Sequence, residues 1–240
     1  MSYLIDGYHR EIVAAAPVSE RVRFIRRTYS HLAGAIAAFV GIEAALLNTN
    51  LGTTLLNTMI GYSGSWLALM VLFVVGGFAA QVMARSRTSA GIQYAGLALY
   101  VLLEVLIFLP IIAIAEWKFP GHRLPLQAGV LTLAVCSGLT LAVFISGKDF
   151  SFLGPVLWVL SLLALGLVVA AVIGGFSLGL VYAFAMVALA AGFIIYDTSN
   201  IIHHYRTDQY VAASLNLFAS VALMFWYILQ IFMSSRNDDD

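Results

Sequence analysis

The chain has 240 residues, of which 62% are hydrophobic and only 10% are charged, whereas soluble domains carry about 25% charged residues. Its 12 basic and 12 acidic residues cancel, which argues against a nucleic-acid partner, because such proteins carry a basic excess. The single cysteine, Cys136, excludes an internal disulfide and a cysteine-rich metal site. A chain this apolar cannot cover its surface in water, so we expect the lipid bilayer to be its main partner.

Seven apolar segments are long enough to cross the ~30 Å hydrocarbon core as helices, which takes about 20 residues. They are residues 28–47, 63–84, 90–115, 125–147, 153–173, 178–200 and 211–233. Turn-forming and charged residues separate them, so the sequence predicts an all-α integral membrane protein with seven transmembrane helices. The break at Gly174-Gly175 is so short that the fifth and sixth helices must form an antiparallel hairpin. Without this break the C-terminus would change side.

The distribution of lysine and arginine predicts how the chain crosses the membrane. Nine of the 12 lie in the N-terminal tail and in the loops after the second, fourth and sixth predicted helices. Because basic residues favour the cytoplasmic side, we expect the N-terminus in the cytoplasm and the C-terminus outside, in the cell (inner) membrane. The predicted plan is a cytoplasmic tail (1–27), a transmembrane domain (28–233) and an acidic tail (234–240).

Three carboxylic acids fall inside predicted helices: Glu43, Glu104 and Asp197. A carboxylate at bilayer depth costs several kcal/mol, so such groups usually face a bundle interior or a water-filled cavity and mark function. The alternative is a neutral, hydrogen-bonded acid that holds helices together. For Glu43, near the outer end of its helix, both interpretations stay open, whereas Glu104 and Asp197 favour a functional role.

Helical spacing places other polar residues on the same faces as two of these acids. The stripes are Gln93, Tyr100 and Glu104 on the third helix, Asp197, Asn200 and His204 on the sixth, and Asn216, Ser220, Tyr227 and Gln230 on the seventh. In lipid, a polar stripe must face protein or water. The stripes therefore either line a cavity or form ordinary interhelical hydrogen bonds, worth ~0.6–2 kcal/mol each.

Motifs typical of enzymes are missing from the sequence. There is no HExxH, P-loop, GxGxxG or GxSxG pattern, so we expect neither an enzyme nor a resident cofactor. His203 and His204 end the sixth helix, but adjacent helical residues point in different directions. We therefore expect this pair to contact lipid headgroups rather than to share a metal ion.

Two short motifs stand out in the second half of the chain. Residues 192–202 read Gly-Phe-Ile-Ile-Tyr-Asp-Thr-Ser-Asn-Ile-Ile, and residues 147–154 read Gly-Lys-Asp-Phe-Ser-Phe-Leu-Gly. Both resemble motifs of the Bax inhibitor-1 family, also called the transmembrane Bax inhibitor motif family: the Tyr-Asp-Thr signature and the turn between the fourth and fifth helices. The resemblance covers nearly the whole chain from about Arg23, and the chain looks like a bacterial, YccA-like member.

The resemblance implies six helices wrapped around a central hydrophobic helix, and a pH-sensitive leak of Ca²⁺ and other cations. In the family, the Asp of the Tyr-Asp motif, here Asp197, pairs with an Asp on the last helix. Two adjacent carboxylates hold a shared proton, because they do not both ionise cheaply, and this proton sets open and closed states. An Arg at the end of the second helix competes for the pair, and Arg85 occupies that position here.

The last helix departs from the family pattern. Where the family reads Leu-Ser-Leu-Tyr-Leu-Asp-x-x-Asn, this chain has Ser220 at the Asp position and Leu223 at the Asn position. Without like-charge repulsion, we predict that Asp197 stays ionised near neutral pH and that gating by protonation is weakened or lost. Ca²⁺ prefers six to eight oxygen ligands, usually from several carboxylates, so Asp197 is expected to bind it only weakly.

The sequence therefore predicts a cation leak. Its pathway and gating residues are Asp197, Ser220, Arg85, Glu104, Asn216 and Asn200. Glu104 is either a further ion-binding position on the path or the titratable group that replaces the family's second Asp. The alternative is a non-conducting regulator that binds other membrane proteins, such as a membrane protease or its clients. A proton-coupled transporter is disfavoured because no inverted repeat is visible.

Overall fold

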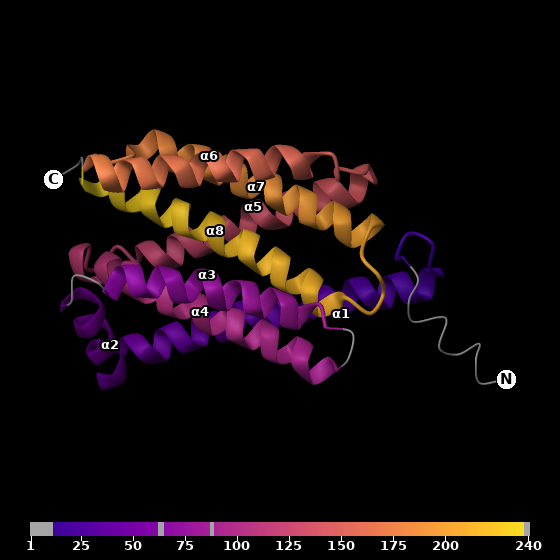
Figure 1. The fold of residues 1–240 in the computed structure, drawn as a ribbon, viewed down its shortest axis with the longest axis horizontal. Helices are drawn as coiled ribbons and strands as arrows, with labels where there is room; N and C mark the ends of the chain where they lie inside the picture. The colour runs from indigo at the N-terminus through magenta and orange to yellow at the C-terminus, as the bar shows by residue number, and fades with distance from the viewer. Residues whose placement is uncertain (1–11, 62–64, 87–88, 238–240) are drawn as a thin grey trace. The chain divides into compact units, whose positions relative to one another are not determined.

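The computed structural model describes residues 12–61, 65–86 and 89–237. Over these ranges the chain forms eight α-helices (Figure 1), and the one extended pairing is an isolated bridge between Ile12 and Arg206. The helices are α1 Val18–Leu47, α2 Asn50–Gly61, α3 Ser65–Ala84, α4 Ala90–Lys118, α5 Leu124–Ser146, α6 Leu153–Gly174, α7 Gly179–His203 and α8 Tyr210–Asn237. The predicted all-α class is confirmed.

Six of these helices are long and apolar enough to cross a membrane. They are α1, α4, α5, α6, α7 and α8. The second predicted segment corresponds to α3, whose apolar part within the described ranges, Ala68–Ala84, is shorter than a full span. The chain is therefore a multi-pass membrane protein, and a seventh crossing through α3 stays a prediction.

The first and last helices extend well beyond the predicted apolar segments. The first helix begins at Val18, ten residues before the expected start, and α8 continues to Asn237. Hydropathy marks only the part of a helix that suits lipid, whereas residues such as arginine and glutamate, which favour helices, continue it into water. Residues 1–11 and 238–240 of the two predicted tails lie outside the described ranges.

The short helix α2 was not predicted, because its segment was assigned to a connector. At 12 residues it is too short to cross the bilayer. Its turn from α1 is tight, since a Cβ added at Gly52 would overlap the Leu46 carbonyl group. Only glycine fits this position without moving the backbone of α1.

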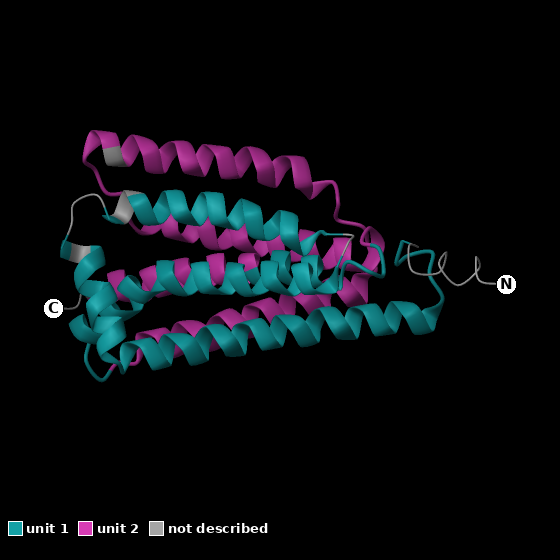
Figure 2. Cartoon of the chain, turned by 60° about the horizontal axis from the view of Figure 1, so that its bottom comes forward, with its two compact units in different colours: residues 1–121, 206–218 teal, residues 122–205, 219–240 magenta. Residues whose placement is uncertain are grey.

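Contacts between residues divide the chain into two compact units (Figure 2). Unit 1 comprises residues 1–121 and 206–218, which include α1 to α4 and the first turns of α8. Unit 2 comprises residues 122–205 and 219–240, which include α5, α6, α7 and the remainder of α8.

Within unit 1, α3 and α4 form an antiparallel pair whose backbones touch. A Cβ at Gly96 would lie 2.6 Å from the Ala80 carbonyl oxygen and 2.7 Å from the Ala84 amide nitrogen. Further along the pair, a Cβ at Gly76 would meet the Leu103 side chain at 2.8 Å. Small residues at such positions let helices approach closely, as is common in membrane bundles.

Within unit 2, α6 and α7 form the antiparallel hairpin that the sequence predicts. The hairpin turns at Gly175, which caps α6 in the left-handed conformation with φ of 65°. About one turn from the start of α6, a Cβ at Gly192 would meet the Leu157 side chain at 2.7 Å. At the far end, a Cβ at Gly154 would lie 3.0 Å from the ring of Tyr196. These contacts fix the register of α6 against α7.

Candidate functional site

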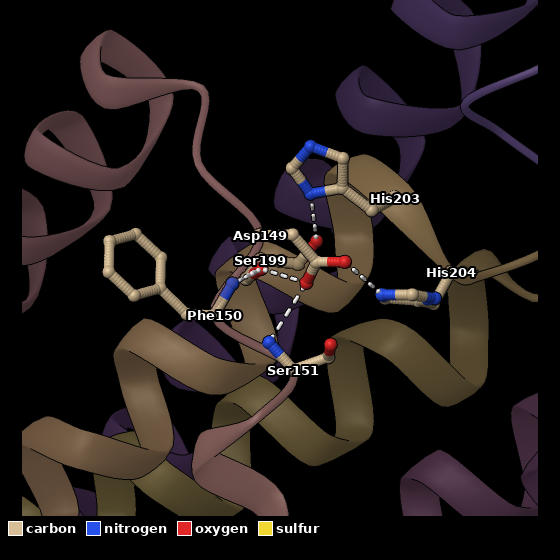
Figure 3. Close-up of polar contacts among 6 residues, drawn as sticks. All are labelled: Asp149, Phe150, Ser151, Ser199, His203 and His204. Atoms are coloured by element: carbon tan, nitrogen blue, oxygen red, sulfur yellow. Dashed lines mark hydrogen bonds and ion pairs between the residues drawn. The ribbon is translucent and has the colours of Figure 1, made fainter.

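The two sequence motifs meet in unit 2 (Figure 3). The Ser199 hydroxyl, near the end of α7, accepts a hydrogen bond from the Phe150 amide over 2.7 Å and lies 3.3 Å from Asp149 Oδ1. Asp149 and Phe150 belong to the loop before α6, far from Ser199 in the sequence. We call the group of Asp149, Phe150, Ser199 and His204 the motif junction. These hydrogen bonds connect the loop at the start of α6 to the end of α7.

Asp149 is the charged group of the motif junction. Its Oδ1 accepts a hydrogen bond from the Ser151 amide at 2.8 Å, and its Oδ2 lies 2.9 Å from Nε2 of His204. The hydrogen bond from the Ser151 amide, with help from His204, lowers the pKa of Asp149 from 3.8 to about 2. Both side chains are partly exposed, at 43% and 48%, so solvent screens this ion pair.

The second histidine contacts the same region. Nδ1 of His203 lies 3.1 Å from the Ser199 carbonyl oxygen. The sequence predicts contact with lipid headgroups for both histidines, and the structure gives each a protein partner that the sequence does not predict. The Asp-x-Ser pattern of residues 149–151 is a recognisable turn signal, because an aspartate often bonds the amide two residues later. No local pattern identifies Ser199 or His204 as the distant partners.

Asp197 and Ser220 form a buried contact between α7 and α8 within unit 2. The Ser220 hydroxyl donates a hydrogen bond to Asp197 Oδ2 across 2.5 Å, and each residue is only 6% exposed. A hydroxyl that donates to a carboxylate typically lies about 2.5–2.7 Å away. The contact that the sequence predicts, a hydroxyl beside Asp197 at the family's second acid position, is present.

The other two intramembrane acids belong to unit 1. Glu104 is 5% exposed and lies on α4 one turn after Tyr100, which is 9% exposed. Glu43 on α1 is 4% exposed, and neither of its carboxyl oxygens has a hydrogen-bond partner among the described residues. Of the two interpretations left open for Glu43, the hydrogen-bonded acid is therefore not what the described residues show.

The remaining predicted site residues are divided between the units. Arg85 follows α3 in unit 1 and is exposed, and Asn216 lies on the part of α8 that belongs to unit 1. Asn200 is half-buried on α7 in unit 2, where its carbonyl oxygen accepts the His204 amide at 2.8 Å. Contact between Arg85 and Asp197 stays a prediction, as do the roles of all six residues in an ion path.

A metal-binding cluster is not found in the described part of the chain. No three or more His, Cys, Asp or Glu side chains are arranged there to hold a metal ion. Asp197 with Ser220 supplies far fewer oxygens than the six to eight that Ca²⁺ prefers.

Comparison with known proteins identifies relatives over most of the chain. The model of the family described as Inhibitor of apoptosis-promoting Bax1 matches residues 21–237. Protein lifeguard 4 of Mus musculus is 29% identical over 97% of this chain and 93% of its own length.

Two further relatives match over shorter regions. A BI1-like protein of Arabidopsis thaliana is 37% identical over 48% of this chain and 47% of its own length. Bax inhibitor 1 of Schizosaccharomyces pombe is 33% identical over 51% of this chain and 47% of its own length. The chain thus matches about half the length of these two relatives. Since the family model covers nearly all the described helices, the chain belongs to the Bax inhibitor-1 family of multi-pass membrane proteins.

Proposed function

We propose that this chain is a cation leak across the membrane, with Ca²⁺ as a principal cargo and Asp197 on its path. The observation that carries the proposal is the buried contact between Asp197 and Ser220, at 2.5 Å and 6% exposure of each residue. A carboxylate buried in a membrane bundle is costly, and such groups usually mark ion pathways. This role is not enzymatic and needs no resident cofactor.

The serine partner limits how protons control this leak. Ser220 donates a hydrogen bond to a carboxylate but cannot share a titrating proton with it, unlike a second acid. Asp197 therefore stays ionised near neutral pH, and flux changes little with pH. Weak coordination by a single carboxylate suits a conducting site, because an ion must also leave it. Asn200 and Asn216 contribute further oxygen atoms, and Arg85 competes with the ion for Asp197.

The proposed topology has seven crossings, with α3 as the second, in the cell (inner) membrane of a bacterium. The N-terminus is cytoplasmic and the C-terminus lies outside, in line with the basic residues of the predicted cytoplasmic side. Six helices surround a central one, and the apolar windows of α4 and α8, the most buried among the candidate spans, make these two helices the candidates for that position.

The experiment is Ca²⁺ flux into vesicles containing the purified full chain, measured from pH 6 to pH 8. Wild type should leak with a shallow pH dependence, Ser220→Asp should make it steep, and Asp197→Asn should reduce the leak. Ser161→Ala is the matched control, because among the described residues this hydroxyl bonds a carbonyl of its own helix, Leu157 O, at 2.8 Å. A wild type with steep pH dependence that Asp197→Asn abolishes would overturn the inference that Asp197 stays ionised, and a wild type without flux at any pH would overturn the leak itself.

A second candidate function is a non-conducting regulator of other membrane proteins. The family description names inhibition of another protein rather than transport, which favours this alternative. Vesicles separate the two functions: a regulator gives no flux at any pH in wild type or in Ser220→Asp. It would instead co-purify with a membrane protein, such as a protease or its client, when extracted in mild detergent.

A further inference from the structure

A groove of about 440 Å³ lies between α1 and α4, entirely within unit 1. Small side chains create it, since Gly34 and Ala38 on α1 face Ala98 on α4. Leu97 and Val101, which are 8% and 4% exposed, form its floor. A Cβ added at Gly34 would meet no atom within 4 Å, so the space beside this glycine is open. We call this feature the α1–α4 groove.

The lining of the α1–α4 groove is polar at one end only. Ser30, His31 and Tyr94 lie at that end, and all other lining residues are apolar. The His31 ring stacks on Tyr94 with centroids 5.4 Å apart, and the Tyr94 hydroxyl lies 3.0 Å from the hydroxyl of Tyr210. The guanidinium carbon of Arg27 lies 5.3 Å from the centre of the Tyr210 ring. Contacts through Tyr94 and Tyr210 therefore place the Arg27 guanidinium group near the polar end of the groove.

The length of the groove matches one leaflet of a bilayer. From His31 to Ile42 the α1 axis rises by ~17 Å at 1.5 Å per residue, and one leaflet is about half of the ~30 Å hydrocarbon core. Dividing 440 Å³ by this length gives a mean cross-section of roughly 26 Å². A helix about 10 Å wide has a cross-section of roughly 80 Å². The groove therefore has the length and width that suit an extended hydrocarbon chain.

The charge beside the polar end favours an anion. Arg27 is exposed, and within the described residues no carboxylate lies at ion-pair distance from it. Arg23, one turn earlier, pairs with Glu20 at 2.8 Å, whereas Arg27 lies over the ring of Tyr210, which contacts Tyr94 at the polar end of the groove. A guanidinium group binds phosphate oxygens well, because its donors match their geometry.

We propose that the α1–α4 groove binds one acyl chain of an anionic membrane phospholipid, whose phosphate rests against Arg27 and His31. The polar end of the groove binds the lipid headgroup, and the acyl chain lies along the small residues of α1 and α4 toward the bilayer centre. A bound lipid fills the space that Gly34 and Ala38 leave open. The site is separate from Asp197 and Ser220, and does not depend on ion conduction.

The test is native mass spectrometry of the purified full chain with two lipids of equal chain length, phosphatidylglycerol and phosphatidylcholine. Wild type should bind phosphatidylglycerol about tenfold more tightly, because the phosphate is not masked by a cationic headgroup and charged hydrogen bonds are the stronger kind. Arg27→Gln should lower phosphatidylglycerol binding to the level of phosphatidylcholine. Gly34→Leu should weaken the binding of both lipids, because its side chain fills the groove.

Two further variants make the test decisive. Gly138→Leu on α5 is the matched control, because a Cβ there also meets no atom within 4 Å, and it should bind as wild type does. Ala98→Leu fills the groove from the opposite wall and replaces Gly34→Leu if that variant does not fold. Equal binding of the two lipids by wild type, or unchanged binding by both groove variants, would refute the site. Equally tight binding of free glycerol phosphate would show an anion site without a chain-binding groove.

Discussion

Ser199 on α7 accepts a hydrogen bond from the backbone amide of Phe150, 2.7 Å away in the loop before α6. Both residues belong to motifs by which the family is recognised, so each motif is the structural partner of the other. The signature on α7 therefore has two tasks in this chain. Asp197 accepts a hydrogen bond from the Ser220 hydroxyl. Ser199, two residues later, binds the backbone of the loop before α6.

Replacing Ser199 by alanine should destabilise the protein. The change leaves the partly buried Phe150 amide without its acceptor, which costs about 1–3 kcal/mol. For a protein of this size, each kcal/mol lowers the melting temperature by about 2–4 °C. Thermal unfolding in nanodiscs measures the effect. Ser161→Ala, whose hydroxyl bonds its own helix, should melt within a degree or so of wild type, and an equal loss in both variants would contradict the role of the motif junction.

The charge of Asp149 should stabilise the protein only above acidic pH. Its folded-state pKa is lowered from 3.8 to about 2, so the stabilisation is fully present above the unfolded-state pKa and is lost as the pH falls through the folded-state value. Asp149→Asn should therefore melt below wild type at pH 6, and the difference should shrink between about pH 4 and pH 2. Melting curves across this range check it, and a difference that persists at pH 2 would show that the charge is not responsible.

Gly96→Ala should disrupt the α3–α4 pair. The new Cβ would lie 2.6 Å from the Ala80 carbonyl oxygen, and backbone atoms cannot move aside as a flexible side chain does. Overpacking of this kind typically costs about 1–3 kcal/mol. The control is Gly129→Ala on α5, where a Cβ meets no atom within 4 Å and the better helix propensity of alanine should slightly stabilise the fold. Unfolding curves of the two variants should therefore shift in opposite directions.

Glu43→Met should stabilise the protein or leave its stability unchanged. Both carboxyl oxygens of Glu43 are buried without a hydrogen-bond partner among the described residues, and an unsatisfied buried polar group costs about 1–3 kcal/mol. Methionine has a similar length and removes that cost. The melting temperature in nanodiscs reports stability, and the Ca²⁺ flux assay reports function. A variant that melts lower than wild type would show that Glu43 has a partner that stabilises it.

Much of the fold follows from hydropathy, because lipid demands long apolar helices with every backbone group paired internally. The hairpin at Gly175 was predictable for the same reason, since so short a break between two spans allows only an antiparallel return. Hydropathy did not reveal α2, whose Asn and Thr residues resemble a loop, nor the start of α1 at Val18. There the helix continues among charged residues, where apolar periodicity gives no signal.

The candidate site was partly predictable. Alignment with the family pattern placed Ser220 opposite Asp197, and the structure shows this contact at 2.5 Å. The motif junction was missed because it joins side chains that are distant in the sequence, and neither Ser199 nor His204 shows a local pattern that points to Asp149. The α1–α4 groove was missed because a cavity depends on what two helices lack at facing positions, such as a side chain at Gly34.

The hydrogen bond between Phe150 and Ser199 also limits how the two helices can rearrange. If α7 slid along its axis by even one residue, about 1.5 Å, the Phe150 amide would lose its acceptor, and Tyr196 would collide with the backbone beside Gly154 or leave it. A movement that keeps this hydrogen bond must therefore carry the start of α6 and the end of α7 together.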